Sequence, residues 1–373
     1  MMFAGRKIFT RIFTTIFTKI FTRIFTTIFT KIFTRIFHWN IKFIAYLSIV
    51  CLTILYTNLA AAIPFSARPE VKTFIAEMVQ KHNLDAKTLT LAFSKYGSAP
   101  EIIEKISAPY EEKPWHNYRA LFITEKRING GKEFWRKNKA ALTRAQREYG
   151  VPAEVIVAII GVETSYGENT GKFPVLQALA TLAFDYPKRS AFFKQELEQF
   201  LLLCNEEHFP LTEIKGSYAG AMGIPQFIPS SYRNHAVDFA NIGQRDIINN
   251  PPNAIGSVGN YLKTYGWTAK QSVTHKAKVT GNKYKRIQLA NKKNPKPNLT
   301  VAKAKQHGIV TMGKLYLPSN TKVAFLELDQ GKKGKEYWLV RDNFYAITRY
   351  NHSSHYAMAV YQLSQEIAKA MRN

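Results

Sequence analysis

The segment that decides the fold is PAEVIVAIIGVETSYG, from Pro152 to Gly167. Apolar or small residues fill the positions from Val155 to Val162, and this pattern predicts a helix that is buried on all sides. Glu163 stands at the end of that stretch, and Gly167 lets the chain turn away. A carboxyl side chain placed in such apolar surroundings is uncommon. We therefore take Glu163 as the first candidate functional residue.

A second informative segment, GSYAGAMGIPQFIPSSY, runs from Gly216 to Tyr232. Its small, flexible and amide-bearing residues are suited to lining a groove that binds sugar. Together, the two segments resemble the active site of the B-type lytic murein transglycosylases, which are lysozyme-like enzymes that cut bacterial peptidoglycan. The resemblance extends from about Pro114 to the C-terminus.

The spacing of apolar residues predicts mostly helices after Pro64. Expected helices include one over Lys132–Gly150 and three more over Val175–Phe184, Ser190–Glu207 and Ser354–Met371. Three segments alternate in polarity and are rich in aromatic and β-branched residues: TKVAFLELD, GKEYWLV and NFYAITRY. They predict a small antiparallel sheet between about residues 272 and 347.

The expected fold class is mainly α, within α+β, and the resemblance implies a lysozyme-like helical catalytic core with additional helices and a small inserted antiparallel β domain. The expected divisions are a low-complexity basic and apolar repeat (1–40), a signal peptide or membrane anchor (41–62), a helical domain (64–149), the lysozyme-like catalytic core (150–271), the β insertion (272–347) and a C-terminal segment with its helix (348–373).

The N-terminus consists of a repeat with an inner period of four residues. The unit IFTRIFTTIFTK occupies Ile8–Lys19 and returns at Ile20–Lys31. On a helix, side chains spaced four residues apart shift steadily around the axis, so they form no fixed apolar face. We expect an extension without packed structure. A segment lying on a membrane surface is the alternative, because Phe and Ile alternate with Lys and Arg.

The segment that follows the repeat, Phe43–Ala62, is apolar and is preceded by Lys42. The order of charge, apolar run and Ala60–Ala62 is that of a secretory signal, and the run is also long enough to span a bilayer if it is not cut. We expect an exported, periplasmic protein with a cleaved signal peptide or an inner-membrane anchor, and possible membrane contact through residues 1–62.

The net charge of +26 indicates a polyanionic partner. No zinc finger or aromatic RNA-binding strand is evident, so we expect no nucleic acid. Peptidoglycan glycan strands, which carry carboxylates, fit this charge. The two cysteines, Cys51 and Cys204, leave no disulfide framework once a leader is removed, and Cys204 is expected to be a buried small apolar residue. We expect a monomer.

Cleavage of a glycosidic bond needs a proton for the leaving oxygen. The apolar neighbours of Glu163 and its place at a helix C-terminus both disfavour the anion, so this carboxyl is suited to act as the acid. Most glycosidases use a second carboxylate. Asp185 and Asp238 are candidates by sequence, but neither lies in a motif that indicates a nucleophile or a base.

The resemblance implies one glutamate that acts first as acid and then as base. The N-acetyl group of N-acetylmuramic acid (MurNAc) assists at C1, and the sugar's own C6 hydroxyl closes a 1,6-anhydro ring. No cofactor is implied. The resemblance also implies that Ser217 and Gln226 bond the sugar, and that Met222 packs below the N-acetyl region, although Met222 also fits an ordinary core position. The other expected substrate-binding residues are Tyr118, Lys188, Arg189, Tyr261, Tyr350, Asn351 and Tyr356.

Members of this family often carry a calcium loop of the EF-hand type. The corresponding segment here is DFANIGQRDIIN, residues 238–249. Ala240 and Ile242 offer no side-chain oxygen, and Asn249 cannot replace a bidentate glutamate. We therefore expect no metal site.

Three other functions remain open from the sequence. A hydrolysing muramidase with the same fold is the nearest. A non-catalytic peptidoglycan-binding scaffold is disfavoured, because a pure binder gains nothing from a buried acid at Glu163. A membrane- or nucleic-acid-binding protein would depend on the basic repeat in residues 1–40.

Overall fold

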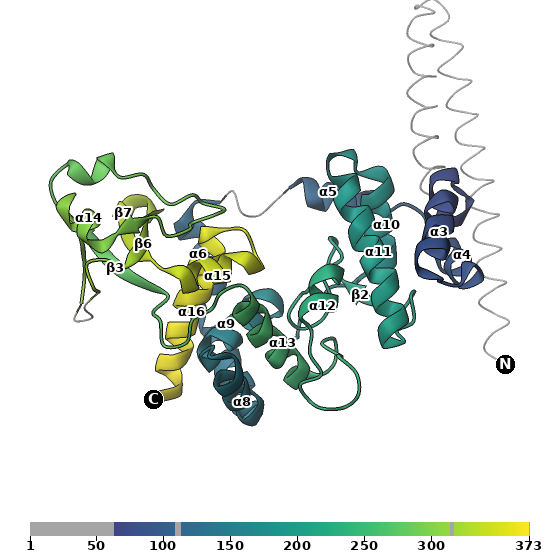
Figure 1. The fold of residues 1–373 in the computed structure, drawn as a ribbon, viewed down its shortest axis with the longest axis horizontal. Helices are drawn as coiled ribbons and strands as arrows, with labels where there is room; N and C mark the ends of the chain where they lie inside the picture. Colours follow the sequence, from purple (N-terminus) through teal and green to yellow (C-terminus); the bar gives the residue numbers. More distant parts are fainter. Residues whose placement is uncertain (1–62, 109–112, 314–316, 373) are drawn as a thin grey trace, which may run out of the picture. The chain divides into compact units, whose positions relative to one another are not determined.

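This computed structural model describes residues 63–108, 113–313 and 317–372, which belong to one compact unit, Ala61–Asn373 (Figure 1). The predictions for the repeat (1–40) and for the signal or anchor (41–62) lie outside the described residues. Within the described ranges, no helix is long and apolar enough to cross a membrane. The division of the remaining chain into domains stays a prediction.

A series of short helices precedes the first motif. They are α3 (Pro69–His82), α4 (Ala86–Ser94), α5 (Pro100–Ser107), α6 (Trp115–Phe122), α7 (Glu125–Lys137) and α8 (Lys139–Tyr149). The prediction of one helix over Lys132–Gly150 is wrong, because the helix breaks at Asn138. The side-chain amide of Asn138 donates to the Phe134 carbonyl at 2.9 Å. Such a local bond competes with the helical pattern and favours a helix end.

The central helices include the buried segment predicted from the sequence, which forms α9. They are α9 (Ala153–Thr164), α10 (Val175–Asp185), α11 (Ser190–Glu207), α12 (Pro229–His235), α13 (Pro251–Thr264) and α16 (Ser354–Arg372). Every residue of α9 except Glu154 and Glu163 is buried. Helices α7, α8, α13 and α16 all contact α9, and Figure 1 labels three of them, α8, α13 and α16, around it. The predicted helices at α10, α11 and α16 are confirmed to within one residue.

Two short strands, β1 (Phe173–Pro174) and β2 (Lys215–Gly216), pair antiparallel. Strand β2 ends at Gly216, the first residue of the second motif. The larger sheet has the order β4-β6-β7-β3-β5, with all its strand pairs antiparallel. Its strands are β3 (Thr274–Val279), β4 (Leu299–Thr300), β5 (Ile309–Thr311), β6 (Lys322–Asp329) and β7 (Lys335–Val340).

The sheet buries both of its faces, because side chains alternate along each strand. Leu326 and Trp338 are paired across β6 and β7 and join the main helical core. Their neighbours Phe325 and Leu339 form a second, smaller core with α14 (Val301–Gln306). The predicted fold class, mainly helical with a small antiparallel sheet, is confirmed.

The prediction of a strand at NFYAITRY is wrong, because this segment forms α15 (Asp342–Tyr350). Phe344 and Ile347 are buried three positions apart, which is helical spacing. Asp342 lies in the first turn, where a carboxylate interacts favourably with the helix dipole and so stabilises the helix. An eight-residue segment rich in aromatic residues fits both the two-residue period of a strand and the 3.6-residue period of a helix. Burial against neighbouring helices decides between the two.

Candidate active site

Glu163 is the penultimate residue of α9 and is half-buried. Its Oε1 accepts a hydrogen bond of 2.6 Å from the hydroxyl of Tyr356, which lies on α16 and is 2% exposed. Burial raises the pKa of Tyr356 well above its ordinary value, and the charge of Glu163 adds to this. The phenol therefore stays protonated and donates its hydrogen bond to Glu163.

Two further predicted tyrosines continue the cluster of rings that begins at Tyr356. The Tyr350 ring is nearly parallel to that of Tyr356, with centroids 6.3 Å apart, and the Tyr261 ring lies 4.8 Å from Tyr350. The Tyr350 hydroxyl donates to the Pro225 carbonyl and the Tyr261 hydroxyl to the Arg349 carbonyl, both at 2.5 Å. These bonds fix three rings from α13, α15 and α16 around the carboxyl of Glu163.

Thr164 joins the two sequence motifs. It is fully buried, its hydroxyl donates to the Ile224 carbonyl at 2.8 Å, and the same oxygen accepts from the Gly167 N–H at 3.0 Å. Ile224 belongs to the second motif. The end of α9 and the second motif are thus bonded one residue away from Glu163, as the resemblance implied.

The turn after Glu163 is held in an uncommon conformation. Ser165, Tyr166 and Gly167 have successive φ values of 50°, 67° and 96°. A left-handed residue other than glycine costs on the order of 1 kcal/mol, so such a turn needs support from its surroundings. Arg127 supplies that support, because its guanidinium donates to the Ser165 hydroxyl at 3.1 Å and its carbonyl accepts from the Tyr166 hydroxyl at 2.6 Å.

Sequence reasoning missed this support. The Tyr166 ring lies over Gly130, Gly131 and Gly161, and a Cβ on any of them would approach Tyr166 atoms to 2.5–2.8 Å. Two adjacent glycines within a helix such as α7 are unfavourable in isolation. The pair at Gly130 and Gly131 was the signal that a bulky group packs closely there.

Three predicted residues lie within the second motif. The Ser217 oxygen accepts from the N–H groups of Ala219 at 3.2 Å and Ala221 at 3.0 Å, which leaves the hydroxyl hydrogen to donate. Gln226 has a φ of 54°, and its side-chain nitrogen donates to backbone carbonyls at 2.9 and 3.0 Å. Met222 is 1% exposed, which fits the ordinary core alternative. Its place below an N-acetyl group stays a prediction.

The remaining predicted residues differ in their distance from Glu163. Tyr118 on α6 is buried, and its ring lies 5.6 Å from that of His355, the neighbour of Tyr356. Asn351 directly follows Tyr350 and is half-buried. Lys188 and Arg189 form a separate exposed pair in η3 (Pro187–Arg189). The Arg189 guanidinium lies 4.2 Å from the centroid of the Phe192 ring.

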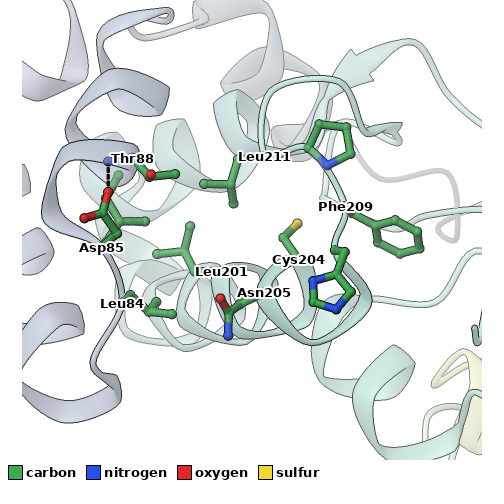
Figure 2. A pocket seen from close by; sticks show the side chains of 11 residues that line it. Leu84, Asp85, Thr88, Leu201, Cys204, Asn205, Phe209 and Leu211 are labelled. Atoms are coloured by element: carbon green, nitrogen blue, oxygen red, sulfur yellow. Dashed lines mark hydrogen bonds between the residues drawn. The ribbon is translucent and has the colours of Figure 1, made fainter.

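A separate pocket of about 360 Å³ lies beside α4 and the C-terminal part of α11, and Figure 2 shows Leu201, Leu211 and Cys204 in its lining. Cys204 is 3% exposed, which confirms its prediction as a buried small apolar residue. Burial raises the pKa of its thiol well above the ordinary value, so the reactive thiolate is disfavoured. Glu163 does not line this pocket.

In the loop predicted to lack calcium, Asp238, the acidic residue at the first ligand position, bonds within the loop. The carboxylate oxygens of Asp238 accept from the N–H groups of Ile242 at 2.9 Å and Gly243 at 2.7 Å. Ala240 and Ile242 have no side-chain oxygen. The residues present therefore do not fit an EF-hand ion. Within the described ranges, no group of three or more His, Cys, Asp or Glu side chains is placed to hold a metal.

The model of the family described as "Transglycosylase SLT domain" matches residues 66–365. This chain belongs to that family. Membrane-bound lytic murein transglycosylase B of Escherichia coli (strain K12) is 39% identical over 322 residues, which are 82% of this chain and 84% of that protein. The lytic transglycosylase class predicted from the two motifs is thus confirmed, and the roles of individual residues stay predictions.

Solved structures agree with this assignment. Soluble lytic transglycosylase SltB1 from Pseudomonas aeruginosa is 43% identical, with a TM-score of 0.76 over 82% of this chain and 100% of that one. The E. coli lytic transglycosylase Slt35 in complex with calcium is 40% identical, with a TM-score of 0.74 over 82% of this chain and 94% of that one. The expected lysozyme-like core is confirmed by these neighbours.

We expect that removing divalent metal leaves this lytic transglycosylase unchanged, because residues 238–249 offer too few oxygen ligands for calcium. The melting temperature should be the same with EDTA, with calcium and with neither. Slt35 serves as the positive control, since its structure contains calcium. A melting temperature that falls with EDTA and returns with calcium would show that the loop binds the ion.

Proposed function

We propose that this lytic transglycosylase cleaves the β-1,4 bond between MurNAc and N-acetylglucosamine in peptidoglycan and leaves a 1,6-anhydroMurNAc end, with Glu163 as acid and then base. The observation that supports this most is the setting of Glu163. It stands at the end of a buried helix, accepts a hydrogen bond from Tyr356, and lies one residue from the Thr164 bond to the second motif.

The proposed reaction needs no water. Glu163 gives its proton to the glycosidic oxygen, and the N-acetyl oxygen assists at C1 as that bond breaks. The Glu163 carboxylate then takes the proton of the C6 hydroxyl, whose oxygen bonds to C1 and displaces the N-acetyl oxygen. This step restores the acid. Tyr356 holds the carboxyl in one orientation throughout, since its hydroxyl contacts Oε1.

We propose a role for each of the predicted substrate-binding residues. Ser217 donates to a sugar or N-acetyl oxygen, because its hydroxyl oxygen already accepts from the backbone N–H groups of Ala219 and Ala221. Asn351 bonds the N-acetyl group through its side-chain amide. The other proposed substrate-binding residues near the cleaved bond are Tyr118, Met222, Gln226, Tyr261, Tyr350 and Tyr356. Lys188 and Arg189 are exposed, so we propose that they meet substrate carboxylates away from the cleaved bond.

The nearest alternative function is that of a muramidase, which hydrolyses the same bond. It would leave a free reducing end, whereas a 1,6-anhydro ring has none. Borohydride reduction of the products therefore tests the proposal. We expect that digestion of purified peptidoglycan releases fragments whose newly formed ends resist reduction. New ends that borohydride reduces would favour hydrolysis.

The E. coli relative is named as membrane-bound, and this supports a place in the cell envelope. We propose export to the periplasm, with residues 41–62 acting as a cleaved signal peptide or an inner-membrane anchor. The Lys and Arg residues of the repeat precede the apolar run, so residues 1–40 would stay on the cytoplasmic side. We further propose that the enzyme acts as a monomer.

The fragment from Pro64 onward should fold and cut peptidoglycan alone, because the two motifs and all their described contacts lie within it. Its turnover on purified sacculi should match that of the chain that retains the repeat. The comparison is made with both proteins in the same detergent. A fragment that is folded by circular dichroism yet inactive would show that residues 1–63 take part in the reaction.

A further inference from the structure

A basic groove of about 860 Å³ lies between the larger sheet and α16. Its walls come from β3, β7, α6, α16 and the turn before β7. Five of its lining side chains are cationic and two are acidic. The cations are Arg119, Lys276, Lys278, Lys333 and Lys335, and the acids are Glu336 and Glu366. The groove therefore favours an anionic occupant.

The basic groove is separate from the proposed active site. Helix α16 contributes to both, but with different faces. Tyr356 is buried and contacts Glu163, whereas Gln365 is exposed and lines the groove. A helix turns about 100° per residue, so these two side chains point about 180° apart. Occupation of the groove thus leaves the surroundings of Glu163 unobstructed.

Three lysines in the groove have no acidic partner. Among the described residues, no carboxylate lies within 4 Å of the ammonium groups of Lys276, Lys278 or Lys333, whereas Lys335 pairs with Glu327 at 2.6 Å. Lys276 and Lys278 lie two positions apart on β3 and so share one face of the strand. Their positive charges are available to an incoming anion.

Trp338, which lines the groove, has a side-chain donor without an acceptor among the described residues. Trp338 is 8% exposed, and its indole N–H has no hydrogen-bond partner among the described residues. The Lys276 ammonium lies 5.9 Å from the Trp338 ring centroid, and Arg119 Nε donates to Gln362 at 2.6 Å. These contacts hold two of the cations in place.

We propose that the basic groove binds the carboxylate-bearing peptide stems of peptidoglycan and so holds the wall at a second point while the glycan is cut. This inference rests on the proposed substrate. A groove with several cations matches an extended peptide with several carboxylates. A neutral sugar is a poorer match, because cations outnumber acids in the lining and the Trp338 indole is almost fully covered.

The test compares two triple variants in the full chain, both also carrying Glu163→Gln so that the wall is not cut. The groove variant is Lys276→Gln, Lys278→Gln, Lys333→Gln. The control replaces three exposed lysines of the N-terminal helices by glutamine, namely Lys72, Lys81 and Lys105, and has the same net charge. Because all six lysines are exposed, we expect melting temperatures within about 2 °C of each other. Lys278→Gln alone provides a milder variant.

The probes are intact sacculi, sacculi stripped of peptide stems by an amidase, and vesicles of anionic phospholipid. We expect the groove variant to bind intact sacculi about fivefold or more weakly than the control, since each exposed pair contributes modestly. Both should bind stripped glycan equally. The difference should shrink at high salt, which screens exposed charges.

Equal binding of both variants to intact sacculi would overturn the proposal. So would a loss that is equally large on stripped glycan, or one confined to vesicles, which would indicate a lipid site. The proposed function fails by a separate result, namely no fragment release by the chain that retains Glu163. Binding and release therefore report on the two proposals independently.

Discussion

Replacement of Glu163 by glutamine should remove nearly all cleavage of peptidoglycan while the fold stays intact. The amide keeps the size of the side chain and can still accept from Tyr356, but it cannot give up a proton to the glycosidic oxygen. General acid–base catalysis contributes roughly a hundredfold or more, so the rate should fall at least that far. The measurement is the rate at which soluble fragments leave purified sacculi.

Glu154→Gln provides the matched control, because Glu154 is the other half-buried glutamate of α9 and lies at the opposite end of the helix. It should keep nearly full activity. Both variants should melt at the temperature of the unsubstituted protein. Retention of more than about a tenth of the activity by Glu163→Gln would contradict the role of this residue as the acid.

Tyr356→Phe should lower the cleavage rate by roughly tenfold to a hundredfold, since a hydrogen bond to a charged group contributes about 1.5–3 kcal/mol. Phenylalanine keeps the ring that faces Tyr350 and loses only the hydroxyl that contacts Glu163. That hydroxyl favours the ionised carboxylate. Its loss should let the acid stay protonated to higher pH, so the alkaline limb of the pH–rate profile should move upward.

The pH profile separates this effect from a general loss of structure. Tyr345→Phe is the control, because Tyr345 is also half-buried in this region, on α15, and its ring centroid lies 4.3 Å from the Arg349 guanidinium. It should change neither the rate nor the profile. A Tyr356→Phe variant with an unshifted profile and an unchanged rate would show that the hydroxyl does not act on Glu163.

Helices with one dominant signal could be predicted closely. The bounds of α11 match the prediction, and α9 follows from its continuous apolar run. The failures came where the local pattern was ambiguous. The segment at α15 alternates like a strand over eight residues, and only its packing shows that Phe344 and Ile347 share a helical face. The break at Asn138 depends on one side-chain bond.

The candidate site was only partly visible in the sequence. Glu163 could be found because a carboxyl ends an apolar run, and the tyrosines came from the family resemblance. The support of the turn by Arg127 and Tyr166 could not be foreseen, since the two residues are brought together by the packing of α7 on α9. The basic groove combines distant segments for the same reason.

The most direct test of the central claim is the mass of the new sugar ends after digestion of purified peptidoglycan in water enriched with heavy oxygen. The proposed reaction closes the ring with the sugar's own C6 oxygen. We therefore predict ends that weigh one water less than hydrolysed ends and carry no heavy oxygen. Ends of full mass that contain heavy oxygen would show that water attacks C1, and would contradict the assignment of Glu163 to intramolecular transglycosylation.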